Sequence, residues 1–354
     1  ARMIMAGMYF KKDIPFKDVY FTSVIRDTQG RKMSKSLGNS PDPLDVIRDY
    51  GADALRFTVI YLAPLGQDVL FSTDKCEIGR NFANKIWNAG RFLLMNAQTI
   101  PINEKLIDKH LDFSDKWINS RFHQTLSDLN KAMDKFEVNN ASKIIYSFVW
   151  SDFCDWYIEL AKNRLYSAED EVKSAVLTRA IKMFENLLKI VHPFMPFITE
   201  ELWHVMGYGK ENDSIMVAQW PQPAGEVEYA ELGIGKDIVD YVEAKHEMIK
   251  VGRMLKLDYG IPVAKQVDYI IKPNTNDIAA MLTNEKRHIE TALKAGQITI
   301  DISAAFEKAV PSGICVLGTI FMPLEGLIDV DAELEKLTLQ QADIIADIEK
   351  LAAK

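Results

Sequence analysis

Apolar residues recur at helical spacing through the middle of the chain. We predict five helices there, at about 73–97, 115–135, 138–165, 168–191 and 196–206. In the second and third helices the apolar side chains follow at steps of three or four residues, which gives each helix one apolar face. The two faces consist of Ile118, Phe122, Leu126, Leu129, Met133 and Phe136, and of Ile145, Phe148, Val149, Phe153, Trp156, Tyr157 and Leu160. Short connections favour an antiparallel bundle, which we expect for residues 76–225.

The segments before this helical region have a different pattern. Residues 19–25 are rich in β-branched and aromatic side chains, which is typical of a strand. Asp42 followed by Pro43 is typical of a helix N-cap and first turn, so two short helices are expected from Pro43 to about Ala63. Residues 1–40 are therefore predicted to be the end of an α/β domain, and residues 41–75 a helical connector.

Beyond a Gly- and Pro-containing connector at 207–225 the pattern becomes mixed. We expect helices at about 231–257 and 276–295 and strands at 266–271, 297–302 and 314–322. A small α+β unit is therefore predicted for residues 226–330. In residues 331–354, apolar side chains recur at a and d spacing, which predicts the start of a coiled coil. These side chains are Leu334, Leu337, Ile344, Ile348 and Leu351. The predicted fold class is mainly α.

Composition narrows the setting. The chain has 354 residues, 48% of them hydrophobic and 26% charged, and no apolar run approaches the roughly 18 residues that a membrane span needs. Its three cysteines are too few for a disulfide framework, so we expect a cytoplasmic protein with no membrane contact. The net charge of −8 disfavours indiscriminate nucleic-acid binding. Residues 1–50 nevertheless hold nine Lys and Arg against six Asp and Glu, so a local basic patch remains available.

A short lysine loop carries the clearest chemistry. Lys32-Met33-Ser34-Lys35-Ser36 lies between Gly30 and Gly38. Ammonium groups neutralise phosphate oxygens, serine hydroxyls add hydrogen bonds, and flanking glycines let the backbone turn. A solvated Lys/Ser turn is the alternative interpretation. The predicted strand before the loop and helix start after it favour a phosphate-binding loop.

These residues resemble a known family. The segment 32–36 matches the KMSKS signature of class I aminoacyl-tRNA synthetases, and residues 42–47 and 50–57 are similar to the branch that serves valine, isoleucine and leucine. Three later segments resemble the valyl-tRNA synthetases most: 79–89, 153–162 and 192–203. The chain starts at Ala1 and has no HIGH-like signature, so the resemblance implies a C-terminal part of such an enzyme.

The resemblance implies what each part does. Residues 1–40 would end a Rossmann-type catalytic domain, and ATP with Mg²⁺ would bind at the loop. Lys32 and Lys35 would act on the triphosphate in catalysis, Ser34 and Ser36 would add hydroxyl donors, and Met33 would anchor the loop. No protein-bound metal is expected. The whole enzyme would activate valine with ATP and transfer it to tRNA(Val), and we expect it to be monomeric.

One face of the helix at 73–97 is the second candidate site. Arg80, Asn84, Trp87, Asn88 and Arg91 share a helical face, and Asn81 lies beside it. Guanidinium groups, amides and an indole are suited to RNA, because they meet phosphates, base edges and base faces. The alternative is that Trp87 and Phe92 lie in the core and the polar residues bridge helices. The family resemblance favours contact with the anticodon side of tRNA.

Two other readings of the whole chain stay open. The first is a fragment of an isoleucyl- or leucyl-tRNA synthetase. The second is a stand-alone tRNA-binding module without catalysis, since we expect the isolated chain to be inactive.

Overall fold

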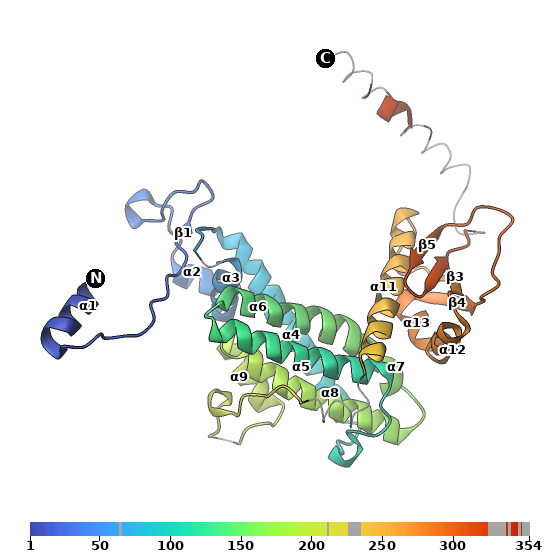
Figure 1. The fold of residues 1–354 in the computed structure, drawn as a ribbon, viewed down its shortest axis with the longest axis horizontal. Coiled ribbons are helices and arrows are strands. Elements are labelled where there is room, and N and C mark those ends of the chain that lie inside the picture. Colours follow the sequence, from blue (N-terminus) through green and yellow to red (C-terminus); the bar gives the residue numbers. More distant parts are fainter. Residues whose placement is uncertain are drawn as a thin grey trace. The chain divides into compact units, whose positions relative to one another are not determined.

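The computed structural model describes residues 1–63, 66–210, 212–225 and 235–324, together with Thr338, residues 341–345 and Ile348. Contacts divide the chain between Gly235 and Lys236 into two compact units (Figure 1). No described helix is long and apolar enough to cross a membrane.

The N-terminal part of the first unit contains little regular structure before residue 43. It comprises α1 (Arg2–Ala6), a π-helical turn (Gly7–Lys11), β1 (Ile25–Arg26), a 3-10 turn (Lys35–Leu37), α2 (Pro43–Tyr50), α3 (Ala52–Leu62) and β2 (Val69–Leu70). The two predicted short helices are confirmed, and the Asp42 carboxylate caps α2 by accepting from the Leu44 amide at 2.9 Å.

The predicted strand at 19–25 is wrong. Only Ile25 and Arg26 form a strand, in parallel with Val69 and Leu70, and the Val24 carbonyl extends this pairing by accepting from the Val69 amide at 2.9 Å. Residues 19–22 lie in no strand. Val19 and Phe21 are 56% and 77% exposed. A sequence with strand propensity forms a strand only where a neighbouring backbone supplies the ladder and a core covers one face. Residues 19–22 are exposed and lie in no strand, so neither condition is met there.

The middle of the chain is helical, as predicted. It contains a 3-10 turn (Thr73–Cys76), α4 (Glu77–Ala97), α5 (Phe113–Asp134), α6 (Val138–Ser147), a π-helical segment (Phe148–Tyr157), α7 (Ile158–Leu165), α8 (Asp170–Val191) and α9 (Pro196–Val205). The π-helical segment joins α6 to α7 without a break, inside the helix predicted at 138–165. A capping box between Asp112 and Asp115 starts α5, and Pro196 stands in the first turn of α9.

Two contacts fix α3 against these helices. Gly79 of α4 lies so close to α3 that a Cβ there would be 2.4 Å from the Ala54 carbonyl oxygen, so only glycine permits this approach. A side chain in the first turn of α3 caps the start of α9. The Asp53 carboxylate accepts from the amides of Phe197 and Ile198 at 3.2 and 2.7 Å. Helix α3 therefore connects the lysine-loop region to the helical region.

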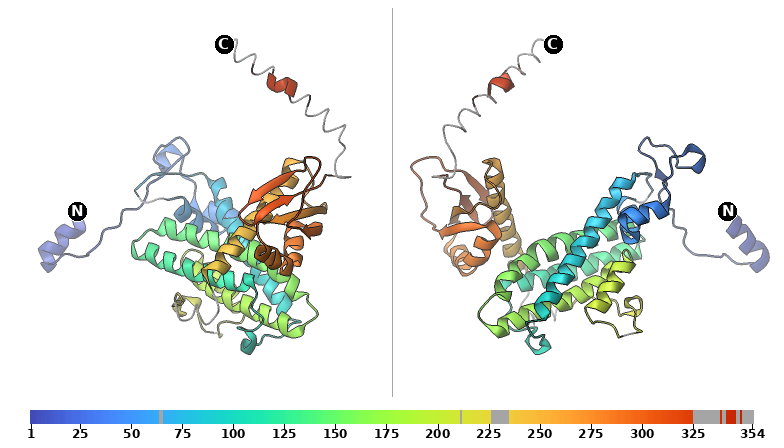
Figure 2. Two further views of the ribbon diagram at one scale, coloured as in Figure 1. Left: turned by 45° about the vertical axis from the view of Figure 1, so that its right-hand side comes forward. Right: turned by 180° about the vertical axis from the view of Figure 1, so that it is seen from behind.

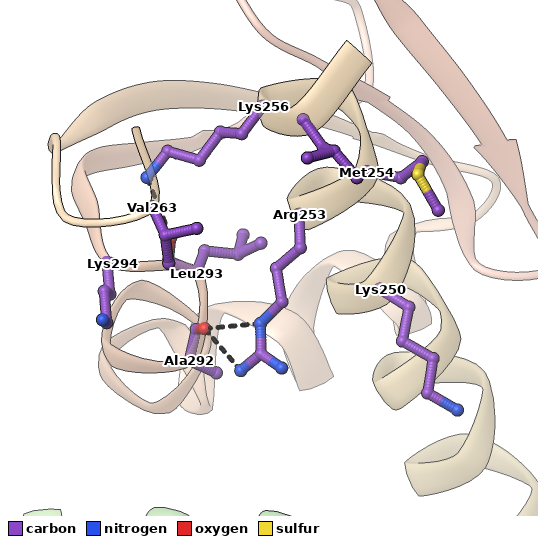
Figure 3. A pocket seen from close by; sticks show the side chains of 9 residues that line it. Lys250, Arg253, Met254, Lys256, Val263, Ala292, Leu293 and Lys294 are labelled. Carbon is purple, nitrogen blue, oxygen red and sulfur yellow. Dashed lines mark hydrogen bonds between the residues drawn. The ribbon is translucent and has the colours of Figure 1, made fainter. Parts of the chain in front are cut away.

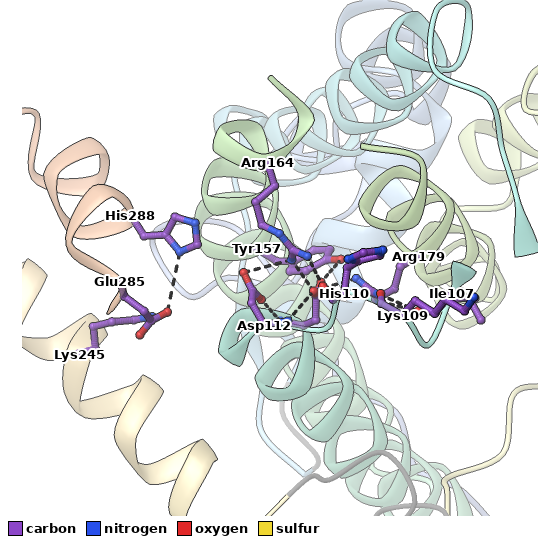
Figure 4. A network of polar contacts seen from close by, with 11 residues as sticks. Ile107, Lys109, His110, Asp112, Tyr157, Arg164, Arg179, Lys245, Glu285 and His288 are labelled. Atoms are coloured by element: carbon purple, nitrogen blue, oxygen red, sulfur yellow. Dashed lines mark hydrogen bonds and ion pairs between the residues drawn. The ribbon is translucent and has the colours of Figure 1, made fainter. Parts of the chain in front are cut away.

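A buried ion network holds a loop against α5, α7 and α8 (Figure 4). Asp115 is fully buried and pairs with Arg164 and with Arg179, whose Nη1 lies 2.8 Å away. The Tyr157 hydroxyl donates to the same carboxylate at 3.0 Å. Arg179 also donates to the backbone carbonyls of Ile107 and Lys109. The network thereby ties the segment before α5 to α7 and α8.

The second unit is an α+β fold, as predicted. It comprises α11 (Lys236–Asp258), β3 (Val267–Pro273), α12 (Asn276–Asn284), α13 (Lys286–Leu293), β4 (Ala295–Ile300), β5 (Ser312–Cys315) and β6 (Gly318–Phe321). The sheet order is β4-β3-β6-β5, with β3 and β4 parallel and the other pairs antiparallel (Figure 2). Helix α11 packs against β5 and β6.

Two elements that were predicted as continuous in this unit are each interrupted and form two shorter elements. The helix expected at 276–295 breaks at Glu285, because that carboxylate turns inward to the buried Lys245 ammonium at 2.8 Å. The strand expected at 314–322 is the β5–β6 hairpin, turned at Val316 and Leu317 before Gly318 at φ 150°. The predicted coiled coil lies largely outside the described residues. Of its apolar positions only Ile344 and Ile348 are described, and both are exposed.

Candidate functional site

The base of the lysine loop is organised by Asp27. This residue is 7% exposed, and its carboxylate accepts from the amides of Gln29 and Arg31 at 3.0 and 2.8 Å, and from Arg31 Nε at 2.8 Å. A turn closes at Gly30, whose φ of 77° suits glycine, and Arg26 pairs with Asp68 to hold β1 to the segment before β2. The hydrogen bond from Asn39 holds the pKa of Asp27 well below its usual range. Burial acts in the opposite direction, but its effect on the pKa is smaller.

Asn39 closes the loop from the other side. Its amide nitrogen donates to Asp27 at 2.9 Å and to the Lys32 carbonyl at 3.3 Å, while its oxygen accepts from the Ser34 amide at 2.9 Å. One side chain therefore fixes the backbone on both sides of Met33. The base of the loop, Lys32–Ser34, is therefore held in place by hydrogen bonds to Asn39.

The outer part of the loop is a single 3-10 turn. Ser34 caps it by accepting from the Leu37 amide at 3.3 Å, and Gly38 ends it at φ 63°. The Ser34 and Ser36 hydroxyls are 3.2 Å apart. Lys32 and Lys35 are exposed, and neither ammonium has an ion pair or hydrogen bond within the part of the chain that the structure describes. Two unengaged cations beside two hydroxyls can receive an anion.

Met33 points into the protein from this loop. It packs against a small apolar cluster built from Val46, Phe71 and Cys76, together with Ile25, Tyr50, Leu55 and Val59. The anchoring role of Met33 stays a prediction, and this packing is the contact through which the side chain would hold the loop. The Arg80 guanidinium of α4 stands 5.3 Å from the centre of the Tyr50 ring, over its face. The cluster under the loop therefore continues to the first turn of α4.

Helix α4 turns opposite faces to the core and to solvent. Phe82, Ile86 and Leu93 are fully buried. The predicted RNA-facing residues lie on the other side, where Asn81, Asn84, Trp87, Asn88 and Arg91 are all exposed and Arg80 is half-buried. Trp87 is 39% exposed, so the alternative that places its ring in the core is wrong. Arg80 pairs with Glu77 at 3.0 Å, whereas no described residue pairs with Arg91.

The sequence interpretation missed the residues that support these sites. Asp27 and Asn39 flank the signature, and an Asp three residues before a glycine is a turn signal that pointed to one of them. The stacking partner of Arg80, Tyr50, has no local signal, because the two lie thirty residues apart and meet only in the fold, where α2 and α4 both pack against α3. Among the described residues no group of three or more His, Cys, Asp or Glu is placed to hold a metal.

Known proteins match both regions. Residues 1–72 match the family model "tRNA synthetases class I (I, L, M and V)", and residues 115–271 match the "Anticodon-binding domain of tRNA ligase". The face of α4 lies between the two matched segments.

The whole chain is similar to longer proteins named valine–tRNA ligase. It is 41% identical to the one from Fusobacterium nucleatum over 362 aligned positions, which cover 100% of this chain and 40% of that protein. For Chlorobaculum tepidum and Bacillus subtilis the identities are 38% and 37%, again over 100% of this chain, with 40% and 39% of the relatives covered. The chain therefore spans about two fifths of the length of these relatives.

Proposed function

The chain belongs to the class I tRNA synthetases and is related along its whole length to valine–tRNA ligases, so we propose that it serves valine activation and transfer to tRNA(Val). The observation that carries the proposal is the loop at Lys32–Ser36, where two exposed ammonium groups stand on a backbone held by Asn39. The choice of valine rests on the names of the relatives.

The loop would act on the triphosphate of ATP. When the valine carboxylate attacks the α-phosphate, a bond to the valine oxygen forms and the bond to the pyrophosphate oxygen breaks, so negative charge grows on the leaving pyrophosphate. Lys32 and Lys35 would stabilise that charge more than the charge of bound ATP, which is how such groups accelerate a reaction. Ser34 and Ser36 would donate to phosphate oxygens, and Mg²⁺ would enter with the nucleotide.

The exposed face of α4 would bind tRNA on its anticodon side. Arg91 would meet a phosphate, the amides of Asn81, Asn84 and Asn88 would meet base edges, and Trp87 would offer a stacking surface. Stacking on the Tyr50 ring would hold the Arg80 guanidinium in position for the RNA. We propose the antiparallel bundle at 76–225 as the anticodon-binding domain, and the segment 331–354 as the start of a coiled-coil arm. A monomeric cytoplasmic enzyme is part of the same proposal.

The test is valine-dependent exchange of pyrophosphate into ATP, measured on the full-length enzyme that carries this chain. Lys35→Ala is expected to lower the exchange rate by well over tenfold, because a cation is lost where charge develops. Lys135→Ala removes another exposed lysine, at the end of α5, and is the matched control. Exchange that is unchanged in Lys35→Ala would refute the assignment of the loop.

A further inference from the structure

The second unit contains a pocket that the proposed sites do not use. It lies within that unit, between the last turns of α11, the turn that follows them and the end of α13, and has a volume of about 630 Å³ (Figure 3). Ligand pockets in proteins typically measure about 300–1,000 Å³. This volume is sufficient for a nucleotide.

The pocket is apolar with basic side chains around it. Met254, Leu257 and Val263 contribute apolar surface and are 54%, 68% and 69% exposed. Four of the nine lining residues are basic and none is acidic: Lys250, Arg253, Lys256 and Lys294. A contiguous apolar surface edged by one sign of charge favours a partner that is both apolar and anionic.

Two of the basic side chains are held in place. Arg253 donates from Nε and Nη2 to the Ala292 carbonyl at 3.0 and 2.7 Å, so its guanidinium is fixed at the end of α13. Lys256 is 3% exposed and donates to the Lys265 carbonyl at 2.6 Å. Burial, and then the nearby Lys294, lower the pKa of Lys256. Hydrogen bonds to neutral carbonyls therefore hold these two basic side chains in place at the pocket.

Lys294 is the exposed member of the group. It follows the last residue of α13 with φ 50°, a left-handed conformation that turns the chain into β4. No described residue forms an ion pair with this ammonium, which lines the pocket together with Lys256. It is therefore the cation best placed to meet an incoming anion.

We propose that this pocket binds an unpaired nucleotide of an RNA loop, with the base on Met254, Leu257 and Val263 and the phosphate at Arg253 and Lys294. A base has an apolar face and a phosphodiester has the anionic charge, which matches both parts of the pocket. Helix α11 lies within the segment that matches an anticodon-binding domain. The proposal rests on the proposed function, since it assigns a second contact to the same tRNA partner.

The test measures binding of the 354-residue chain to a labelled valine tRNA transcript and to a short single-stranded RNA at several salt concentrations. Lys294→Asn removes the exposed charge and keeps a residue that tolerates left-handed backbone. Leu257→Glu places a carboxylate on the apolar surface. The matched controls are Lys308→Asn, at an exposed lysine outside the pocket, and Ile314→Glu, at a residue of β5 that is 85% exposed.

We expect Lys294→Asn to weaken tRNA binding about five- to tenfold and to reduce the salt slope by about one, and Leu257→Glu to weaken binding by more than tenfold. Both controls should bind like the unaltered chain, and all four variants should retain its circular dichroism. Photo-crosslinking from 4-thiouridine in the RNA should reach Met254 or Leu257.

Three outcomes would overturn this proposal. Unchanged affinity in both pocket variants would do so while leaving the α4 face intact, provided that Arg91→Ala still weakens binding. Binding of poly-glutamate that the pocket variants abolish, with RNA affinity unaffected, would assign the pocket to an acidic protein instead. Absence of any tRNA binding by the unaltered chain would remove the proposed tRNA function together with this pocket.

Discussion

The amide side chain of a single residue, Asn39, holds the lysine loop through three hydrogen bonds. Asn39 donates to Asp27 and to the Lys32 carbonyl and accepts from the Ser34 amide. A carboxylate at this position could still accept from Ser34 but could not donate to Asp27. Asn39 is therefore a positioning residue. The pH dependence of activity in Asn39 variants can distinguish this role from a merely structural one.

We expect Asn39→Asp to lower pyrophosphate exchange roughly ten- to a hundredfold near neutral pH in the full-length enzyme, because the reacting groups are displaced. Two facing carboxylates raise the pKa of one of them, so the pair gains a shared proton as pH falls. As the pH falls from about 7.5 to about 5.5, the activity of Asn39→Asp relative to the unaltered enzyme should recover, whereas that of Asn39→Ala should not. Identical pH profiles for the two variants would contradict this role.

The two arginines on α4 differ in their surroundings. Arg80 pairs with Glu77 and stacks on Tyr50, whereas Arg91 is exposed and has no described partner. We expect Arg91→Ala to weaken tRNA binding by about 1–3 kcal/mol and to reduce the salt slope by about one. Arg48→Ala, which removes an exposed guanidinium on α2, should leave both unchanged. Equal loss in the two variants would mean that the effect is general charge rather than a contact.

At the scale of the element, helices were predictable and the short strands were not. Apolar periodicity of about 3.6 residues is a property of the segment itself, so the middle helices could be found from sequence. The pairing of Ile25 with Val69 depends on a segment more than forty residues away, and the break at Glu285 depends on Lys245, forty residues earlier. Contacts of this range have no local pattern that could predict them.

The candidate site divides in the same way. The lysines, serines and Met33 were predictable because they form one continuous signature, and the α4 face because its residues recur at helical spacing. Asp27 and Asn39 were missed because twelve residues separate them and the hydrogen bond between them exists only in the folded loop. Sequence thus indicated the groups suited to the chemistry but missed those that hold them.

Replacing Asp115 tests how much the buried ion network stabilises the helical region. Burial alone would raise its pKa, but Arg164 and Arg179 hold the pKa of this carboxyl below its ordinary value. Replacing one partner of a buried ion pair leaves the other charge unpaired, so Asp115→Asn should destabilise the first unit by about 3–5 kcal/mol. Asp128→Asn breaks an exposed pair with Lys131 on the same helix and should cost less than about 1 kcal/mol.

The sign of the pH dependence follows from the lowered pKa. A carboxylate whose folded pKa lies below its unfolded value of about 3.9 contributes its full stability above that value and loses it as pH falls through the folded pKa. Urea denaturation between about pH 5 and pH 2 should show a steeper loss of stability in the unaltered chain than in Asp115→Asn. Parallel losses would show that Asp115 does not carry this linkage.

At the scale of the whole molecule, local charge matters more than total charge. The chain carries a net charge of −8, yet the lysine loop, Arg91 and the basic pocket each present cations at separate places. An acidic remainder weakens binding to RNA in general and leaves affinity to these local contacts. A tRNA that engages several of them together would be bound more tightly than an RNA that reaches only one.

Anticodon recognition by the helical region is tested by the affinity of this chain for purified valine, isoleucine and leucine tRNAs, compared with a valine tRNA whose anticodon has been substituted. Salt should be varied, since phosphate contacts alone give sequence-independent binding. We predict preference for valine tRNA that is lost when the anticodon is changed. Equal binding to all four RNAs at every salt concentration would contradict the assignment of the helical region to anticodon recognition.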